Sequence, residues 1–298
     1  MFPKTVTLVE VGPRDGLQNE ATLLSTPEKV KLIKELASAG LRIVEAGSFV
    51  SPKWVPQMAD SAEVLRGLDK EGAQQYPVLV PNLRGLQEAI DAGAKDIAVF
   101  AAASDTFSQK NINCTIDESL TRYQGVIEQA LAANIRVRGY VSCVLGCPYE
   151  GEIALSAVTR VATALYEMGC YEVSLGDTLG VGTPEKAKLM LAAVAEKMPL
   201  EHLAVHFHDT YGQALANIYA CLTLGVSKID SSIGGLGGCP YAPGAAGNVA
   251  TEEVVYLLEG LNIAHGTDLK ALVRISRAIT AKLNHPPRSK VAQALKLE

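Results

Sequence analysis

Short apolar, β-branched runs alternate with longer amphipathic segments along the whole chain. Eight such runs predict strands, over residues 5–11, 42–46, 77–80, 96–101, 136–142, 172–175, 204–208 and 228–232. The segments between them repeat apolar positions every three or four residues. This spacing predicts helices over residues 27–39, 86–92, 116–133, 156–168, 184–197 and 213–224.

Capping residues support these helix boundaries. Ser25 and Thr183 each come shortly before a proline and a glutamate, a pattern typical of a helix start. Glycines follow the last apolar position of several helices, where a left-handed residue ends a helix most easily. They are Gly40, Gly93, Gly169 and Gly225.

Eight β/α repeats without a linker predict a (β/α)8 TIM barrel. A doubly wound open sheet would require a phosphate-binding glycine turn after an early strand, and the sequence has none. Residues from about 251 to 298 follow the eighth repeat, and we expect them to form extra C-terminal helices that cap the barrel. We therefore interpret residues 1–298 as one catalytic domain.

The amino-acid composition and net charge limit the kinds of molecule that the protein is expected to bind. Hydrophobic residues make up 48% of the 298 residues and the net charge is −5, which suits a globular protein with a large core. The sequence has no basic run, so we expect neither a nucleic acid nor a membrane as partner. Six scattered cysteines without a C-x-x-C pair predict reduced thiols. The first strand starts by residue 5, which predicts a cytoplasmic protein without a targeting segment.

Polar residues recur where the predicted strands end, and in a barrel these ends surround the active site. Residues 204–208 are apolar apart from His206 and His208, which share a face because strand side chains alternate. Two adjacent imidazoles suggest a divalent metal, although a hydrogen-bonded pair of core histidines is an alternative. Asp15 and the amide oxygen of Asn248 would complete an N2O2 set. Such a set favours Mg²⁺ or Mn²⁺, with Zn²⁺ and Co²⁺ as competitors.

Other polar residues at these strand ends suit chemistry next to a carbonyl group. Arg14 could stabilise an enolate oxygen, Asp177 and Glu45 are candidates for proton transfer or positioning, and Cys239 lies in a glycine-rich loop that could act as a lid. Together they indicate carbon–carbon bond cleavage or formation.

Each of these residues also has a purely structural interpretation. Asp15 and Asp177 could be turn or cap residues, Arg14 a surface cation, and Asn248 the N-cap of a helix over residues 249–258. We expect Trp54 to pack in the core.

Six segments resemble the 3-hydroxy-3-methylglutaryl-CoA lyases over nearly the whole chain. They are residues 12–20, 45–58, 139–143, 147–151, 174–182 and 234–248, and the last of them, GGLGGCPYAPGAAGN, is the most specific. The resemblance implies a TIM-barrel enzyme that cleaves (S)-3-hydroxy-3-methylglutaryl-CoA into acetyl-CoA and acetoacetate, a reaction of leucine degradation and ketone body metabolism. Animal mitochondrial members carry a cysteine near the C-terminus, and residues 294–297 have none.

The resemblance also implies roles for individual residues. Asp15, His206, His208 and Asn248 would hold the metal, and Arg14 would stabilise the thioester enolate. Asp177 and Cys239 would transfer protons, with Glu45 and His206 as further catalytic residues. The substrate-binding residues would be Arg14, Gln18, Tyr140, Ser142 and Thr178.

Three alternatives stay open at this point. The chain could cleave another 3-hydroxyacyl-CoA, it could be a condensing synthase of the isopropylmalate or homocitrate type, or it could be a catalytically silent barrel. Lys53, Arg84 and Lys110 follow successive strands and are candidates for the CoA phosphates. By analogy with the family we expect a homo-oligomer.

Overall fold

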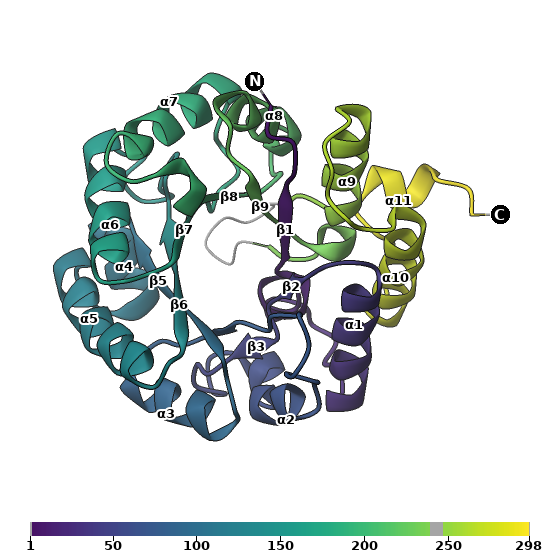
Figure 1. Ribbon diagram of the computed structural model, residues 1–298, viewed down its shortest axis with the longest axis horizontal. Coiled ribbons are helices and arrows are strands. Elements are labelled where there is room, and N and C mark those ends of the chain that lie inside the picture. The colour runs from purple at the N-terminus through teal and green to yellow at the C-terminus, as the bar shows by residue number, and fades with distance from the viewer. Residues whose placement is uncertain (1, 239–246, 298) are drawn as a thin grey trace.

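The computed structural model describes residues 2–238 and 247–297. Within them, nine strands form one curled sheet in the order β2-β1-β9-β8-β7-β6-β5-β4-β3, and all neighbouring strands are parallel. Figure 1 shows the strands at the centre of a ring of helices. The prediction of a TIM barrel is confirmed. The strands are β1 (Thr7–Glu10), β2 (Ile43–Val44), β3 (Gly47–Ser48), β4 (Val78–Leu79), β5 (Asp96–Ala102), β6 (Arg136–Ser142), β7 (Glu172–Asp177), β8 (Leu203–Phe207) and β9 (Lys228–Ser231).

The second predicted strand, over residues 42–46, is divided in the structure. Its first part, β2, pairs with β1, and β3 after it pairs with β4. Between them, the Glu45 amide donates to the Glu10 carbonyl on one side, and the Ala46 amide donates to the Pro77 carbonyl on the other. The segment from β2 to β3 therefore fills one position of the barrel and closes it.

Helices follow the strands and surround them. They are α1 (Thr26–Ser38), α2 (Ser61–Arg66), α3 (Leu83–Asp91), α4 (Asp105–Ile112), α5 (Ile116–Ala132), α6 (Leu155–Glu167), α7 (Pro184–Ala195), α8 (Ala214–Leu224), α9 (Thr251–Gly260), α10 (Leu269–Lys282) and α11 (Lys290–Ala294). The predicted caps are present: Ser25 and Glu28 form a reciprocal capping box at α1, and Gly225 ends α8 with a φ of 100°.

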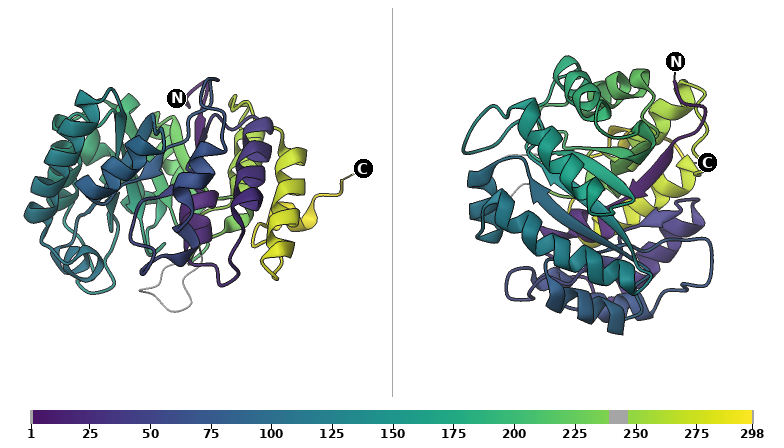
Figure 2. Two further views of the ribbon diagram at one scale, coloured as in Figure 1. Left: turned by 90° about the horizontal axis from the view of Figure 1, so that it is seen from below. Right: turned by 60° about the vertical axis from the view of Figure 1, so that its left-hand side comes forward.

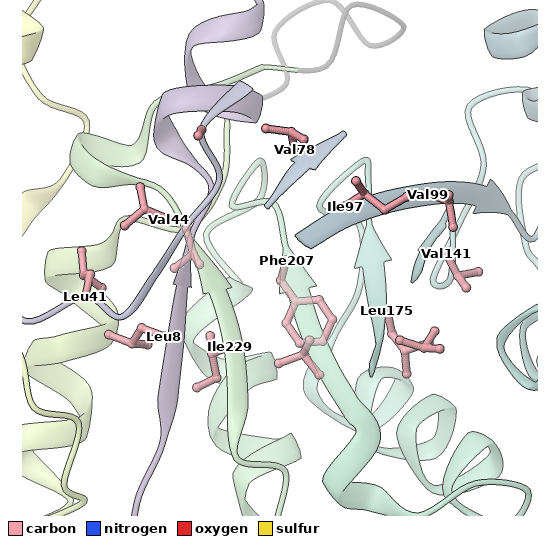
Figure 3. Close-up of a cluster of buried hydrophobic side chains, with 14 of the residues drawn as sticks. Leu8, Leu41, Val44, Val78, Ile97, Val99, Val141, Leu175, Phe207 and Ile229 are labelled. Carbon is pink, nitrogen blue, oxygen red and sulfur yellow. The ribbon is translucent and has the colours of Figure 1, made fainter. Parts of the chain in front are cut away.

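The main core lies between the sheet and the helices. Leu8, Ile97, Leu175, Phe207 and Ile229 project from different strands into this layer, where each is almost completely buried (Figure 3). A smaller cluster of Leu79, Ala98 and Tyr140 is separate from it. The alternation of apolar outward-facing side chains with other residues leaves the inward-facing positions available for polar groups.

The last helices lie beside the barrel. Figure 2 shows α10 next to α1, and the two helices are in contact. Among the described residues, no helix combines the length and the apolar character needed to cross a membrane. The five described cysteines, Cys114, Cys143, Cys147, Cys170 and Cys221, are buried.

Candidate metal centre and active site

His206 lies in β8 and His208 directly follows this strand, and their two imidazole rings lie side by side. Val205 and Phe207 belong to the outer core, where Figure 3 shows Phe207, so His206 and His208 share the opposite face, as the alternation predicted. Their ring centroids are 5.5 Å apart, and both side chains are buried. His206 also meets Tyr140 of β6 edge to face, with 6.0 Å between ring centroids.

Asp15 reaches this pair from the first βα connection. Residues Gly12–Gly16 form one turn of π-helix directly after β1, with Pro13 in its first turn. Asp15 Oδ2 lies 4.0 Å from His206 Nε2 and 3.9 Å from His208 Nε2. These separations exceed a hydrogen bond, but two metal–ligand bonds of about 2.1 Å can span them.

The donor set fits a divalent cation. Ligand atoms of Asp15, His206 and His208 all lie within 4.8 Å of one another. His206 Nδ1 faces Asp230 Oδ2 at 3.2 Å, a pairing that leaves Nε2 free to bind a metal. Burial, and then the neighbouring His206, lower the pKa of His208 to about 4, so this imidazole is neutral at pH 7. Neutral imidazoles and a carboxylate are the forms that metal binding requires.

Asn248 belongs to the same cluster. The N-cap of α9 is Ala250, so the interpretation of Asn248 as a helix cap is wrong. Instead, Asn248 Nδ2 donates to Asp15 Oδ2 over 2.7 Å. A half-turn of the amide would present its oxygen to the same space. Gly237 has to be a glycine for this approach, because a Cβ there would lie 2.8 Å from Asn248 Nδ2.

Arg14, Glu45 and Tyr140 form a buried network next to Asp15. Arg14 Nε and Nη2 each lie 2.7 Å from Glu45 Oε2, and Arg14 Nη1 donates to Asp15 Oδ1 over 2.7 Å. The Tyr140 hydroxyl donates to Glu45 Oε1, also over 2.7 Å. Burial would raise the pKa of Asp15, but Arg14 and the two histidines outweigh it and lower this pKa to about 2. The Asp15 carboxyl is therefore held in its ionised form.

A second polar network lies inside the barrel and was not predicted. Arg138 donates to both oxygens of Asp230 over 3.0 and 2.7 Å, and its Nε donates to Glu172 over 2.7 Å. Ser174 also donates to Asp230 Oδ2. Although burial would raise the pKa of Asp230, Arg138 lowers it far below its usual range. The charged residue Arg138, in the middle of a predicted strand, was the feature of the sequence that could have indicated this network.

Asp177 is buried at the end of β7 but turns toward its own loop. Its Oδ1 accepts from the amides of Gly180 and Val181, and its Oδ2 accepts from the amide of Gly182. Burial nevertheless raises the pKa of this carboxyl, because it outweighs the three amide donors.

The other predicted site residues lie at strand ends or outside the described residues. Ser142, the last residue of β6, and Thr178, which directly follows β7, are half-buried, and Thr178 Oγ1 accepts from the Cys143 amide over 3.0 Å. Gln18 is half-buried two residues after the π-helical turn. Cys239 lies outside the described residues, so its role stays a prediction. Trp54 is 86% exposed, so the prediction that it packs in the core is wrong.

Comparison with known proteins identifies the family. The HMGL-like family matches residues 5–279. The mitochondrial hydroxymethylglutaryl-CoA lyase of Bos taurus is 60% identical over 98% of this chain and 90% of its own. The crystal structure of hydroxymethylglutaryl-CoA lyase from Pseudomonas aeruginosa superposes with a TM-score of 0.96 at 56% identity, covering 98% of both chains.

A further solved structure shows a relative with ligands. It is an HMG-CoA lyase from Acinetobacter baumannii in complex with coenzyme A and 3-methylmalate, with a TM-score of 0.94 and 36% identity over 99% of this chain and 96% of that one. Family match, sequence identity and fold agree over almost the full length. The chain therefore belongs to the HMGL-like family, among its hydroxymethylglutaryl-CoA lyases.

Proposed function

We propose that this protein is a divalent-metal-dependent lyase that cleaves (S)-3-hydroxy-3-methylglutaryl-CoA into acetyl-CoA and acetoacetate. The observation that carries the proposal is the cluster of Asp15, His206 and His208, with Arg14 bonded to the same aspartate. Relatives with 56 to 60% identity over nearly the full chain are hydroxymethylglutaryl-CoA lyases, and they support the choice of substrate.

Asp15, His206, His208 and Asn248 would hold the cation. A set of two imidazoles and two oxygens without a thiolate favours Mg²⁺ or Mn²⁺ over Zn²⁺ or Co²⁺. When bound, the cation supplies Lewis acidity that makes the C3 hydroxyl of the substrate more acidic.

The proposed reaction conserves all atoms of the substrate. A base removes the proton of the C3 hydroxyl, and the C3 oxygen becomes the ketone of acetoacetate as the C2–C3 bond breaks. The bonding electrons form the enolate of acetyl-CoA, and a proton delivered to C2 completes acetyl-CoA. The charge that develops is on the thioester oxygen, and Arg14 is the buried cation suited to stabilise it.

Glu45 and Tyr140 support Arg14 in this role. Glu45 binds the guanidinium on one oxygen and the Tyr140 hydroxyl on the other, so the arginine is held in one orientation. Because an oriented charge needs no rearrangement during the reaction, this arrangement favours the transition state.

Asp177 and Cys239 are the proposed proton carriers, and His206 is proposed as a catalytic residue as well as a metal ligand. The raised pKa of Asp177 suits a group that must hold a proton for part of the cycle. If Cys239 carries the second proton, Cys239→Ser lowers kcat by about 10²-fold or more and leaves Mn²⁺ affinity unchanged. Turnover close to that of the parent would exclude the thiol from the chemistry.

The substrate would contact Gln18, Tyr140, Ser142 and Thr178 at the strand ends. The three cations predicted for the CoA phosphates, Lys53, Arg84 and Lys110, are all exposed, and Arg84 is paired with Glu88 over 3.0 Å. We favour the two lysines for this role.

A substrate panel tests the assignment against its alternatives. Purified protein with Mg²⁺ receives 3-hydroxy-3-methylglutaryl-CoA, a second 3-hydroxyacyl-CoA, or acetyl-CoA with a 2-oxo acid, and the products are separated by chromatography. We expect turnover of the first substrate to be fastest. Faster cleavage of another thioester, or condensation with the 2-oxo acid, would replace the proposal by that activity.

We also propose one catalytic domain over residues 1–298, in which residues from about 251 form the C-terminal cap, and a homo-oligomeric assembly. A cytoplasmic location stays a prediction.

A further inference from the structure

Glu10 is a buried carboxyl that the proposed chemistry does not use. It is the last residue of β1 and has no exposed surface. Leu8, two residues earlier, packs in the outer core, so Glu10 points away from the barrel interior where Tyr140 and His206 meet. Placing a carboxyl in such a position is unfavourable unless hydrogen bonds compensate.

Glu10 makes three such bonds, and they reach three different segments. Its Oε1 accepts from the amides of Gly12 and Ile233 over 2.7 and 2.8 Å. Its Oε2 accepts from Thr251 Oγ1 over 2.6 Å. Thr251 Oγ1 also contacts Ser231 Oγ at 2.9 Å. One side chain thus ties the ends of β1 and β9 to the start of α9.

These are the segments that carry two of the proposed metal ligands. Gly12 starts the π-helical turn that contains Asp15, and Thr251 follows Asn248 by three residues. Ile233 starts the turn after β9, and the Leu236 carbonyl that follows accepts from Asn248 Nδ2 over 3.3 Å. Both ligands are therefore attached to backbone that Glu10 holds.

The two loops around the Glu10 carboxyl are packed so closely that they have little room to move. A Cβ added at Gly12 would lie 2.5 Å from Glu10 Oε1 and 2.9 Å from Ile233 Cγ2. A Cβ at Gly16 would lie 2.7 Å from Ser232 Oγ. Since the two loops touch each other directly, the hydrogen bonds of Glu10 set how far apart they lie.

We propose that Glu10 is a positioning residue that sets the separation of Asp15 and Asn248 by holding the two loops that carry them. The inference rests on the metal site of the proposed function. A carboxyl that only stabilised the fold would change stability without changing the affinity of folded protein for the cation. Metal affinity therefore distinguishes a positioning role from a structural one.

The test compares Glu10→Ala with Glu10→Gln by titration of the folded proteins with Mn²⁺, read from the electron paramagnetic resonance signal of the free ion. We expect Glu10→Ala to raise the Kd for Mn²⁺ by about 10- to 100-fold, the effect typical of groups that orient metal ligands. Burial raises the pKa of Glu10 to about 8, so the neutral glutamine is its closest mimic. Glu10→Gln should bind Mn²⁺ within about threefold of the parent.

Two further variants keep the test decisive. Asp96→Ala is the matched control, because Asp96 is a buried strand carboxyl that pairs with Arg136 and contacts neither loop. It should lower the melting temperature but not Mn²⁺ affinity. If Glu10→Ala does not fold, Thr251→Val takes its place, because valine keeps the side-chain volume but cannot donate to Glu10. This variant should raise the Kd for Mn²⁺ severalfold. Parent-like Mn²⁺ affinity in folded Glu10→Ala or in Thr251→Val would overturn the proposal, whether or not the protein is a lyase.

Discussion

Asp230 offers the sharpest test of how the barrel interior prepares the metal site. Its carboxylate receives both Nη atoms of Arg138, the Ser174 hydroxyl and His206 Nδ1. Asp230→Asn preserves the shape of the side chain but replaces one acceptor by an amide donor. Whichever way the amide turns, an N–H group then faces Arg138, and an amide nitrogen in the place of Oδ2 also faces His206 and Ser174.

The structure gives the size of the expected effect. Weakening the contact to His206 loosens a metal ligand, which costs about 10- to 100-fold in metal affinity. Weakening the contact to Arg138 leaves a fully buried guanidinium short of a partner, and this costs about 3 kcal/mol in the free energy of unfolding. The variant should therefore lose both metal affinity and stability.

The two losses are separated by a control within the same network. Glu172→Gln weakens the other ion pair of Arg138, at Nε, without touching His206. Mn²⁺ affinity and urea unfolding are measured for both variants. We expect both to be destabilised and only Asp230→Asn to bind Mn²⁺ more weakly. Equal Mn²⁺ affinity in the two variants would refute the assignment of Asp230 as the residue that orients His206.

Three more predictions follow from the same structure. The folded Glu10 carboxyl has a pKa of about 8 against 4.5 for the free group, so its contribution to stability is complete below about pH 4.5 and falls by about 1.4 kcal/mol per pH unit up to about 8. Glu10→Gln should flatten that decline in urea unfolding between pH 5 and 8, and an unchanged slope would contradict it. Arg14→Gln removes the charge facing the enolate and should lower kcat by about 10²- to 10³-fold in steady-state assays, whereas a change in KM alone would argue against this role. Mn²⁺ at about 100 times its Kd should raise the melting temperature by about 5 °C in calorimetry and EDTA should reverse it, while identical melting curves would speak against the site.

Much of the site could be predicted because strands obey a simple alternation. The apolar positions Val205 and Phe207 placed His206 and His208 on the inner face, and the succession of β/α units placed Asp15 at the same end of the barrel. Where secondary structure is regular, the local sequence is thus enough to predict approximately where a side chain lies in the barrel.

What could not be predicted depends on contacts between distant residues. Arg138 and Asp230 are 92 residues apart, and nothing near either one in the sequence indicates its partner. Glu10 likewise joins Thr251, 241 residues away. The division of the second strand at Glu45 arises because its two neighbours, β1 and β4, pair with different parts of the segment. The local sequence alone did not distinguish Asn248 from a helix cap; the family resemblance placed it among the metal ligands, and the start of α9 at Thr251 excludes the cap.

The most direct test of the central claim is acetoacetate release from 3-hydroxy-3-methylglutaryl-CoA, followed enzymatically with Mg²⁺ or Mn²⁺ and again after EDTA treatment. The account predicts equal amounts of acetoacetate and acetyl-CoA with either cation, and loss of both products in EDTA. Full activity in EDTA would contradict the metal-dependent mechanism, and the absence of product with both cations would contradict the proposed lyase activity itself.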